Sequence, residues 1–106
     1  MLPPDLTQLD TTIHGPVRLG VLTALQIDGS LDFTTLRKRL TVSDGALGVH
    51  LQKLEAAGYV ASRKSFVGRR PQTTYRMTPR GRKAFTAYLD HMQQLLDAAR
   101  GPKRKA

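Results

Sequence analysis

The stretch Ser43–Val60, SDGALGVHLQKLEAAGYV, has the pattern of a helix with a defined beginning and end. Ser43 is a favourable N-cap, because its hydroxyl oxygen can accept a hydrogen bond from a free amide of the first turn. Gly58 can adopt the left-handed conformation that commonly ends a helix. One apolar stripe recurs at helical spacing and consists of Leu47, Leu51 and Leu54. The sequence therefore predicts a helix over residues 43–58 whose leucine side packs on a core.

The opposite side of this helix carries small side chains and few charges. Asp44 places a negative charge at the positive end of the helix dipole. The remaining residues of this side are Gly45, Ala46, Gly48, Val49, His50 and Lys53. Each glycine costs about 1 kcal/mol relative to alanine in a helix interior, so either packing offsets that cost or a partner approaches the backbone closely. We favour close approach to a phosphate backbone or groove floor over a locally weak helix in a small bundle.

Length and composition restrict the class of protein. A chain of 106 residues fits one domain, and the absence of cysteine excludes disulfides and thiolate metal sites. The sequence has neither an apolar run of about 20 residues, as a membrane span needs, nor the pattern of a signal peptide. We therefore expect a cytoplasmic protein.

The net charge of +9 is distributed unevenly along the chain. Residues 1–62 contain five Lys and Arg against six Asp and Glu, whereas residues 63–106 contain twelve against two. This asymmetry favours a polyanionic partner, and nucleic acid before a membrane surface.

Three helical patterns precede the helix at residues 43–58. An apolar seam predicts a first helix over residues 5–14. Pro16 suits the beginning of a second, well-buried helix that extends to Ile27. Asp32 can cap a short third helix, Phe33–Leu40, and a three-residue connection then leads to Ser43. Two helices joined in this way match the helix-turn-helix pattern.

The periodicity changes after Gly58. Residues 59–67 and 72–77 have the composition of two strands joined by a Gly-Arg-Arg-Pro turn, which predicts a β-hairpin with a basic tip. Thr78 and Pro79 then suit the beginning of a last helix that ends near Arg100. Residues 101–106 are expected to be a basic disordered tail.

The sequence thus predicts an α+β fold, mainly helical. It is a single winged helix-turn-helix domain at residues 1–100, with a two-stranded β-hairpin wing at residues 60–77. The terminal helices at residues 5–14 and 79–100 are assigned to dimerisation.

The chain resembles the small winged-helix transcriptional regulators of bacteria and archaea, relatives of the MarR and ArsR types. The matching segments are Ile13–Leu19, Asp32–Leu36, Ser43–Leu51, Leu54–Val60, Lys64–Tyr75 and Thr78–Phe85. The resemblance covers about residues 9–90, and it implies a dimer, a DNA ligand and no catalytic activity. The chain departs from the family tendency at Gly48, where serine is frequent, and at Val49, where a polar or basic residue is frequent.

We expect the front of the helix at residues 43–58 to enter the major groove and the wing to contact the minor groove and the backbone. The candidate DNA-binding residues are Ser43, Asp44, Gly45, Ala46, Val49, His50 and Lys53 on the helix, and Arg63, Lys64, Arg69, Arg70 and Arg76 on the wing. The helix offers no arginine for bidentate reading of guanine, so we expect modest direct readout and a larger share of the affinity from the wing.

The two terminal helices are amphipathic, and we expect them to form a two-fold homodimer interface rather than only to pack on each other within one chain. The expected interface residues are Leu2, Leu6, Leu9, Ile13, Phe85, Leu89, Met92, Leu95 and Leu96. A dimer would place two recognition helices about one DNA turn apart, which predicts a near-palindromic operator.

Other functions receive less support from the sequence. The three histidines lack metal-ligand spacing, and we expect no metal, no cofactor, no catalytic residues and no enzymatic activity. The alternatives are a winged-helix module that binds protein and a sequence-tolerant architectural DNA binder. No separate domain for a small-molecule effector is evident.

Overall fold

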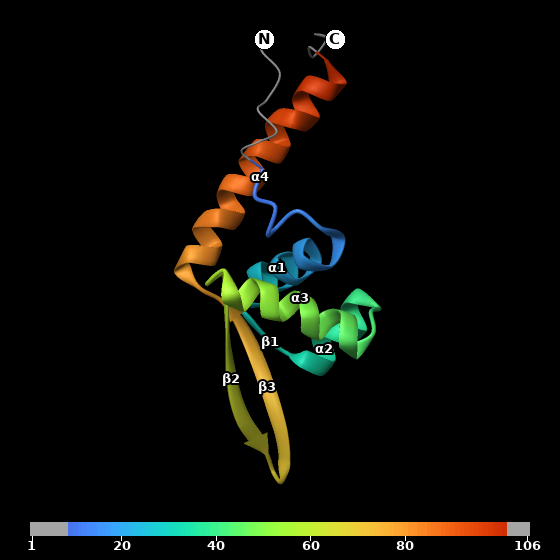
Figure 1. Cartoon of the computed structure of the whole chain (residues 1–106), viewed down its shortest axis with the longest axis vertical. Coiled ribbons are helices and arrows are strands. Elements are labelled where there is room, and N and C mark those ends of the chain that lie inside the picture. Colours follow the sequence, from blue (N-terminus) through green and yellow to red (C-terminus); the bar gives the residue numbers. More distant parts are fainter. Residues whose placement is uncertain (1–8, 102–106) are drawn as a thin grey trace.

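The computed structural model describes residues 9–101, and Figure 1 shows the order and arrangement of its elements. These elements are α1 (Pro16–Asp28), β1 (Ser30–Asp32), α2 (Phe33–Leu40), α3 (Asp44–Ala56), β2 (Val60–Val67), β3 (Arg70–Met77) and α4 (Pro79–Arg100). The fold is the predicted winged helix-turn-helix, in which α2 and α3 form the helix-turn-helix and β2 with β3 forms the wing. None of the helices in the described range is both long and apolar enough to cross a membrane.

The core forms around the leucine stripe of α3, as its spacing predicts. Leu47, Leu51 and Leu54 are each at most 1% exposed. Each neighbouring element contributes apolar side chains to the same cluster, which also contains Ile13, Val21, Leu22, Leu25, Leu36, Val60, Tyr75, Met77, Phe85 and Tyr88. Burial of this continuous apolar surface supplies the main favourable term for folding.

The helix boundaries follow local capping chemistry. Asp32, Ser43 and Thr78 each precede a helix, and each side chain accepts a hydrogen bond from the amide three residues later. After α3, Gly58 has φ of 78°, a conformation that is accessible to glycine at little cost. These predictions from the sequence are confirmed.

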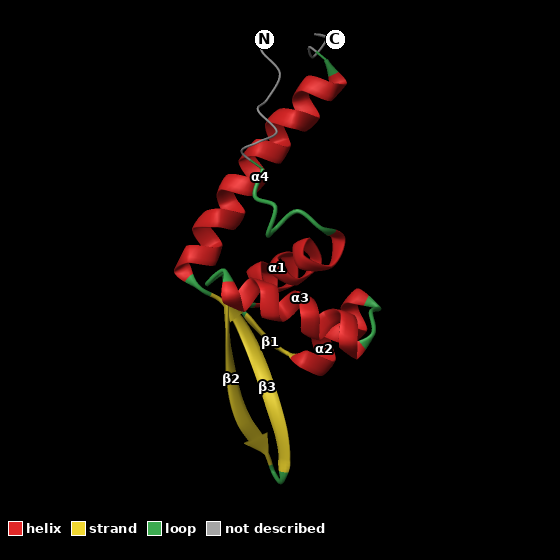
Figure 2. Cartoon of the chain, in the orientation of Figure 1, coloured by secondary structure: helices red, strands yellow, loops and turns green. Residues whose placement is uncertain are grey.

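A third strand was not predicted. Strand β1 pairs with β3 through Ser30–Arg76, Leu31–Tyr75 and Asp32–Thr74, which gives an antiparallel sheet of order β1-β3-β2. The base of the wing is therefore three-stranded, whereas its outer part contains only β2 and β3 (Figure 2). A strand of three residues that follows a turn glycine and ends at the cap Asp32 is too short to show an alternating pattern.

The predicted helix at residues 5–14 is wrong over the part that can be compared. Residues 5–8 lie outside the described residues, and residues 9–14 form turns. The Asp10 carboxylate accepts a hydrogen bond from the Thr12 amide at 2.9 Å, and the Asp10 carbonyl accepts from the amides of Ile13 and His14. Short polar side chains of this kind bond their own backbone and so compete with a helix.

The beginning of α4 lies against the end of the α3–β2 connection. A Cβ added at Gly81 would lie 2.0 Å from the Tyr59 carbonyl oxygen, so only glycine fits there. Thr78 reinforces the junction, because its amide donates to the same Tyr59 oxygen at 3.0 Å. Beyond this junction, the hairpin and the outer half of α4 project from opposite ends of the molecule (Figure 1).

Candidate nucleic-acid interface

The outward surface of α3 is open and built from small side chains. Gly45 and Val49, four residues apart, share its outermost stripe, and Val49 is 52% exposed. Gly48 is half-buried at the flank. A Cβ added at Gly45 or at Gly48 would meet no atom within 4 Å, in contrast to Gly81. The fold itself therefore does not require either glycine, which leaves close approach of a partner as the reason we infer for them.

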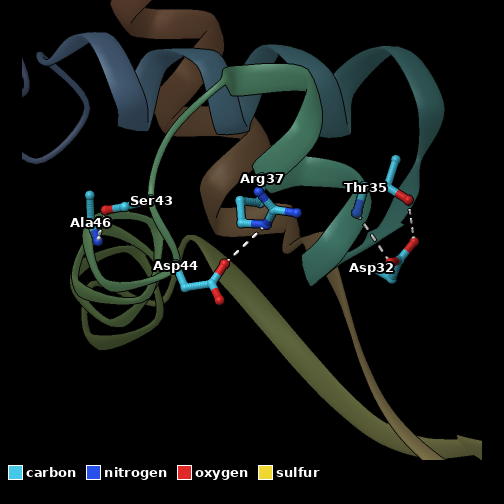
Figure 3. A network of polar contacts seen from close by, with 6 residues as sticks. All are labelled: Asp32, Thr35, Arg37, Ser43, Asp44 and Ala46. Carbon is cyan, nitrogen blue, oxygen red and sulfur yellow. Dashed lines mark hydrogen bonds and ion pairs between the residues drawn. The ribbon is translucent and has the colours of Figure 1, made fainter.

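The N-terminus of α3 is already occupied by protein groups (Figure 3). The Ser43 hydroxyl oxygen accepts from the Ala46 amide at 3.2 Å, and the Asp44 carboxylate lies 3.0 Å from Nε of Arg37 in α2. The Asp44 side chain is 78% exposed, so its negative charge faces any approaching phosphate. Among the predicted contacts at this end, the Ser43 hydroxyl hydrogen is better suited to a phosphate than Asp44.

Asp32 plays the same capping role at α2. Its carboxylate accepts hydrogen bonds from the amide and the hydroxyl of Thr35, the latter at 2.6 Å (Figure 3). The hydroxyl bond is the main cause that lowers the pKa of Asp32. The cap therefore stays negatively charged and fixes the beginning of the helix that precedes the α2–α3 turn.

His50 on α3 is held by α1. Its Nδ1 lies 3.0 Å from Nη1 of Arg18. A guanidinium can only donate, so Nδ1 is the acceptor and the ring hydrogen resides on Nε2. Burial, followed by the positive charges of Arg18 and Lys53, lowers the pKa of His50. His50 therefore presents to a partner a neutral ring with one N–H donor rather than a cation.

Arg18 was missed by the sequence analysis. Its Nε donates to the Thr12 carbonyl at 2.5 Å, so one side chain joins the N-terminal turns, α1 and α3. The Tyr59 hydroxyl bonds the Asp10 carboxylate, which ties the same turns to the end of α3. Because the Arg18–His50 contact joins residues 32 positions apart, no local sequence pattern predicts it.

The pairing of β2 with β3 divides the wing into two sides. Directly paired residues project to the same side of a sheet, and successive residues alternate. One side begins with the buried pair Val60–Met77. The Ser62 hydroxyl on this side donates to Glu55 of α3 at 3.1 Å, so it is the side that faces the helices.

The five predicted wing cations do not form one cluster. The Lys64 side chain projects to the helix-facing side, and Arg69 lies in the two-residue turn with Gly68. The remaining three project to the opposite side and are Arg63, Arg70 and Arg76. Arg70 adjoins the turn and can reach a duplex at the tip, whereas Arg63 and Arg76 lie nearer the base. The prediction of direct contact is therefore strongest for Lys64, Arg69 and Arg70.

The predicted dimer residues differ in accessibility. Ile13 and Phe85 are at most 3% exposed and belong to the chain's own core, so they cannot also supply an interface. Met92 packs partly against the core, as does Leu9. Leu89 and Leu96 are 45% and 43% exposed on α4, and Leu95 is half-buried. Leu2 and Leu6 lie outside the described residues.

Comparison with known proteins agrees with the winged-helix fold. A family model described as a winged helix DNA-binding domain matches residues 17–96. The chain is 37% identical over 79 residues to an uncharacterized protein of Methanocaldococcus jannaschii, an alignment that covers 74% of this chain and 86% of that protein.

Two solved structures share the fold. A transcriptional regulator homologue from Pyrococcus horikoshii aligns with a TM-score of 0.77 and 27% identity, over 83% of this chain and 87% of that one. A protein from Enterococcus faecalis, described as a transcriptional regulator of the MarR family, aligns with a TM-score of 0.67 and 23% identity, over 85% and 83% of the two chains. The element order and the wing are therefore shared with regulators of this type.

Proposed function

Because the chain belongs to the winged helix DNA-binding domain family, we propose that it is a sequence-specific transcriptional regulator that binds double-stranded DNA as a homodimer. In this proposal the outward surface of α3 lies in the major groove and the tip of the wing lies on the adjacent minor groove and backbone. The observation that carries the proposal is the presence, side by side, of an open small-residue helix face and a cationic hairpin without any acidic residue in residues 60–77.

The chemistry of α3 supports close but sparse reading of the bases. Gly45 and Ala46 bring the helix backbone near the groove floor, and Val49 can contact a thymine methyl group. Lys53 and the Nε2 hydrogen of His50 are two donors on this face. Without arginine, the helix lacks the bidentate guanine contact that gives the strongest discrimination, so we expect moderate specificity from α3.

The wing is suited to supply affinity. Lys64, Arg69 and Arg70 are exposed, and Lys53 adds a fourth cation from α3. The negative potential of the minor groove attracts arginine, which matches Arg69 in the turn. If about four phosphates are neutralised per subunit, the logarithm of the binding constant should fall against the logarithm of salt concentration with a slope of roughly −3 to −4 per subunit.

The outer half of α4 supports dimer formation. Leu89 and Leu96 are seven residues apart, so they lie on one face of the helix, and both are exposed. Pairing this face with a second copy would bury it and place two copies of α3 on one duplex. Two-fold symmetry then requires a near-palindromic operator with half-sites about one helical turn apart.

Selection of bound sequences from a random duplex pool tests the proposal. We expect near-palindromic sequences that bind more tightly than random duplex at the same salt concentration. Absence of binding to any duplex at low salt would rule the proposal out and favour a protein-binding module. Equal affinity for selected and random duplex would instead identify an architectural binder, a second candidate that the plain outer face of α3 favours.

A further inference from the structure

The outer half of the hairpin carries two apolar side chains that the core does not use. Phe66 is 73% exposed, and Pro71 is exposed as well. The two residues are direct partners across the β2–β3 pair, so their side chains lie beside each other on one side of the hairpin. Single exposed apolar residues are common on protein surfaces, whereas an aromatic ring paired with a proline on a projecting hairpin forms one continuous apolar surface.

This pair lies on the side of the hairpin that faces the helices. Alternation along β2 places Phe66 on the same side as Ser62, which bonds Glu55 of α3. A duplex in contact with the outer surface of α3 and with the wing tip would therefore lie against this side of the hairpin.

The charges around the pair indicate what covers it. Lys64 lies two residues from Phe66 on the same side, and Arg69 and Arg70 follow at the tip. No acidic residue occurs between positions 60 and 77. An apolar protein partner would gain nothing from these cations. A nucleic acid offers both groups that this surface complements, with phosphates for the cations and base faces for the ring.

We propose that Phe66 and Pro71 form an apolar wedge that enters the minor groove beside the wing tip and partly unstacks one base step. This inference rests on the DNA binding proposed above. The minor groove of B-DNA is about 6 Å wide, and the backbones of two paired strands are already about 4.8 Å apart. The arms of the hairpin therefore fit only where the groove is widened, and unstacking at a wedge widens it.

The wedge has a consequence for the shape and sequence of the bound DNA. Insertion of apolar side chains between base steps kinks a duplex by roughly 20–90° toward the major groove. Pyrimidine–purine steps are the easiest to unstack. The protein thus bends its DNA and favours such a step at the wedge position, which adds specificity that the side chains of α3 do not provide.

Energy transfer between dyes at the two ends of a selected duplex of about 40 base pairs, long enough for two half-sites, measures binding and bending together. We expect the wild-type protein to shorten the end-to-end distance. Phe66→Ala should remove most of the bend and weaken binding about 5- to 150-fold for each wedge lost, the range for lost base–aromatic stacking. Val67→Ala is the matched control, because Val67 is 60% exposed and adjacent but projects to the other side.

The outcomes separate this inference from the proposed function. Binding by the wild-type protein without any bend would overturn the wedge and leave the proposed function standing. Failure of the wild-type protein to bind any duplex would remove both. An equal loss of bending in Val67→Ala would also overturn the wedge. A bend that persists in Phe66→Ala would overturn it as well. If the sedimentation of the free Phe66→Ala protein changes at the same time, Phe66 belongs to a contact between copies of the chain.

Discussion

Helix α3 and the β2–β3 hairpin face the same expected partner but are built in opposite ways. Helix α3 has one side in the core, capped ends and a lateral contact from Arg18, and its residues 44–56 carry one cation and two acids. The hairpin projects from the body, and its residues 60–77 carry five cations and no acid. The well-packed helix therefore has a net charge of only −1, whereas the projecting hairpin has a net charge of +5.

This difference separates two tasks of DNA recognition. Phosphate contacts supply affinity without sequence information, whereas contacts to base edges supply specificity. The five cations of the wing suit it to the phosphate contacts. The fixed position and small side chains of α3 suit the second, because a helix can read a groove only if its backbone lies close and at a constant angle. The following predictions change one region at a time.

Disruption of the proposed dimer should have the largest effect, because it separates the two copies of α3 and of the wing. Leu89→Glu combined with Leu96→Glu puts two charges on the exposed apolar face of α4 and should give a monomer. Loss of the second binding site should weaken binding to a two-half-site duplex by about 10²- to 10⁴-fold. Sedimentation and fluorescence anisotropy measure the two effects. Ala87→Glu with Gln94→Glu, at the same spacing on the opposite face of α4 and at exposed positions, is the matched control and should remain dimeric.

Weakening the wing tip should have the next largest effect. Arg69→Ala with Arg70→Ala should lower affinity for all duplexes and make the salt slope shallower by about 2 per subunit, one unit per lost phosphate contact. Thermal stability should change little, because both side chains are exposed. Arg63→Ala with Arg76→Ala removes the same charge nearer the base of the hairpin and should have a smaller effect. Equal slopes for both variants would show that only total charge matters.

Adding methyl groups to the open face of α3 should have opposite effects on the stability of the protein and on its DNA binding. Gly45→Ala and Gly48→Ala should each stabilise the protein by up to about 1 kcal/mol, because alanine is the better helix former and the space is empty. Gly45→Ala should nevertheless weaken DNA binding, since its methyl group would lie on the outermost stripe, and Gly48→Ala at the flank should weaken it less. Denaturant unfolding and anisotropy test this. Improved binding by Gly45→Ala would contradict close approach.

Acidification should have the smallest effect. The lowered pKa of His50 means that the unfolded state takes up a proton at a higher pH than the folded state. The contribution of neutral His50 to stability is therefore complete above about pH 6.5, the ordinary pKa of histidine, and is lost as pH falls through the lower folded-state pKa. His50→Gln should flatten this part of the stability profile. An unchanged difference in stability between wild type and variant from pH 7.5 to 5 would contradict it, since all other side chains are common to both proteins.

Much of the fold could be predicted because its signals are local. The caps at Asp32, Ser43 and Thr78 and the leucine stripe of α3 each lie within a few residues, and the structure confirms them. Strand β1 has only three residues, too few for an alternating pattern in the sequence to predict it. At residues 9–14 the Asp10 carboxylate bonds the Thr12 amide, and this local bond competes with an apolar seam suited to a helix.

The candidate site was predictable in composition but not in arrangement. The helix face and the basic wing follow from residue types. The division of the wing cations was already implied by strand alternation, since neighbours such as Arg63 and Lys64 must project to opposite sides. The Arg18–His50 contact depends on the tertiary packing of α1 against α3, so only the structure reveals that His50 is a neutral donor.

The central claim is that α3 and the wing tip contact one duplex at the same time. The chain has no cysteine, so Val49→Cys and Arg69→Cys can each be labelled with an iron chelate that cleaves nearby DNA. We expect cleavage in a major groove from position 49 and in the adjacent minor groove from position 69, about five base pairs away within each half-site. Cleavage from only one of the two positions, or at places more than a helical turn apart, would contradict it.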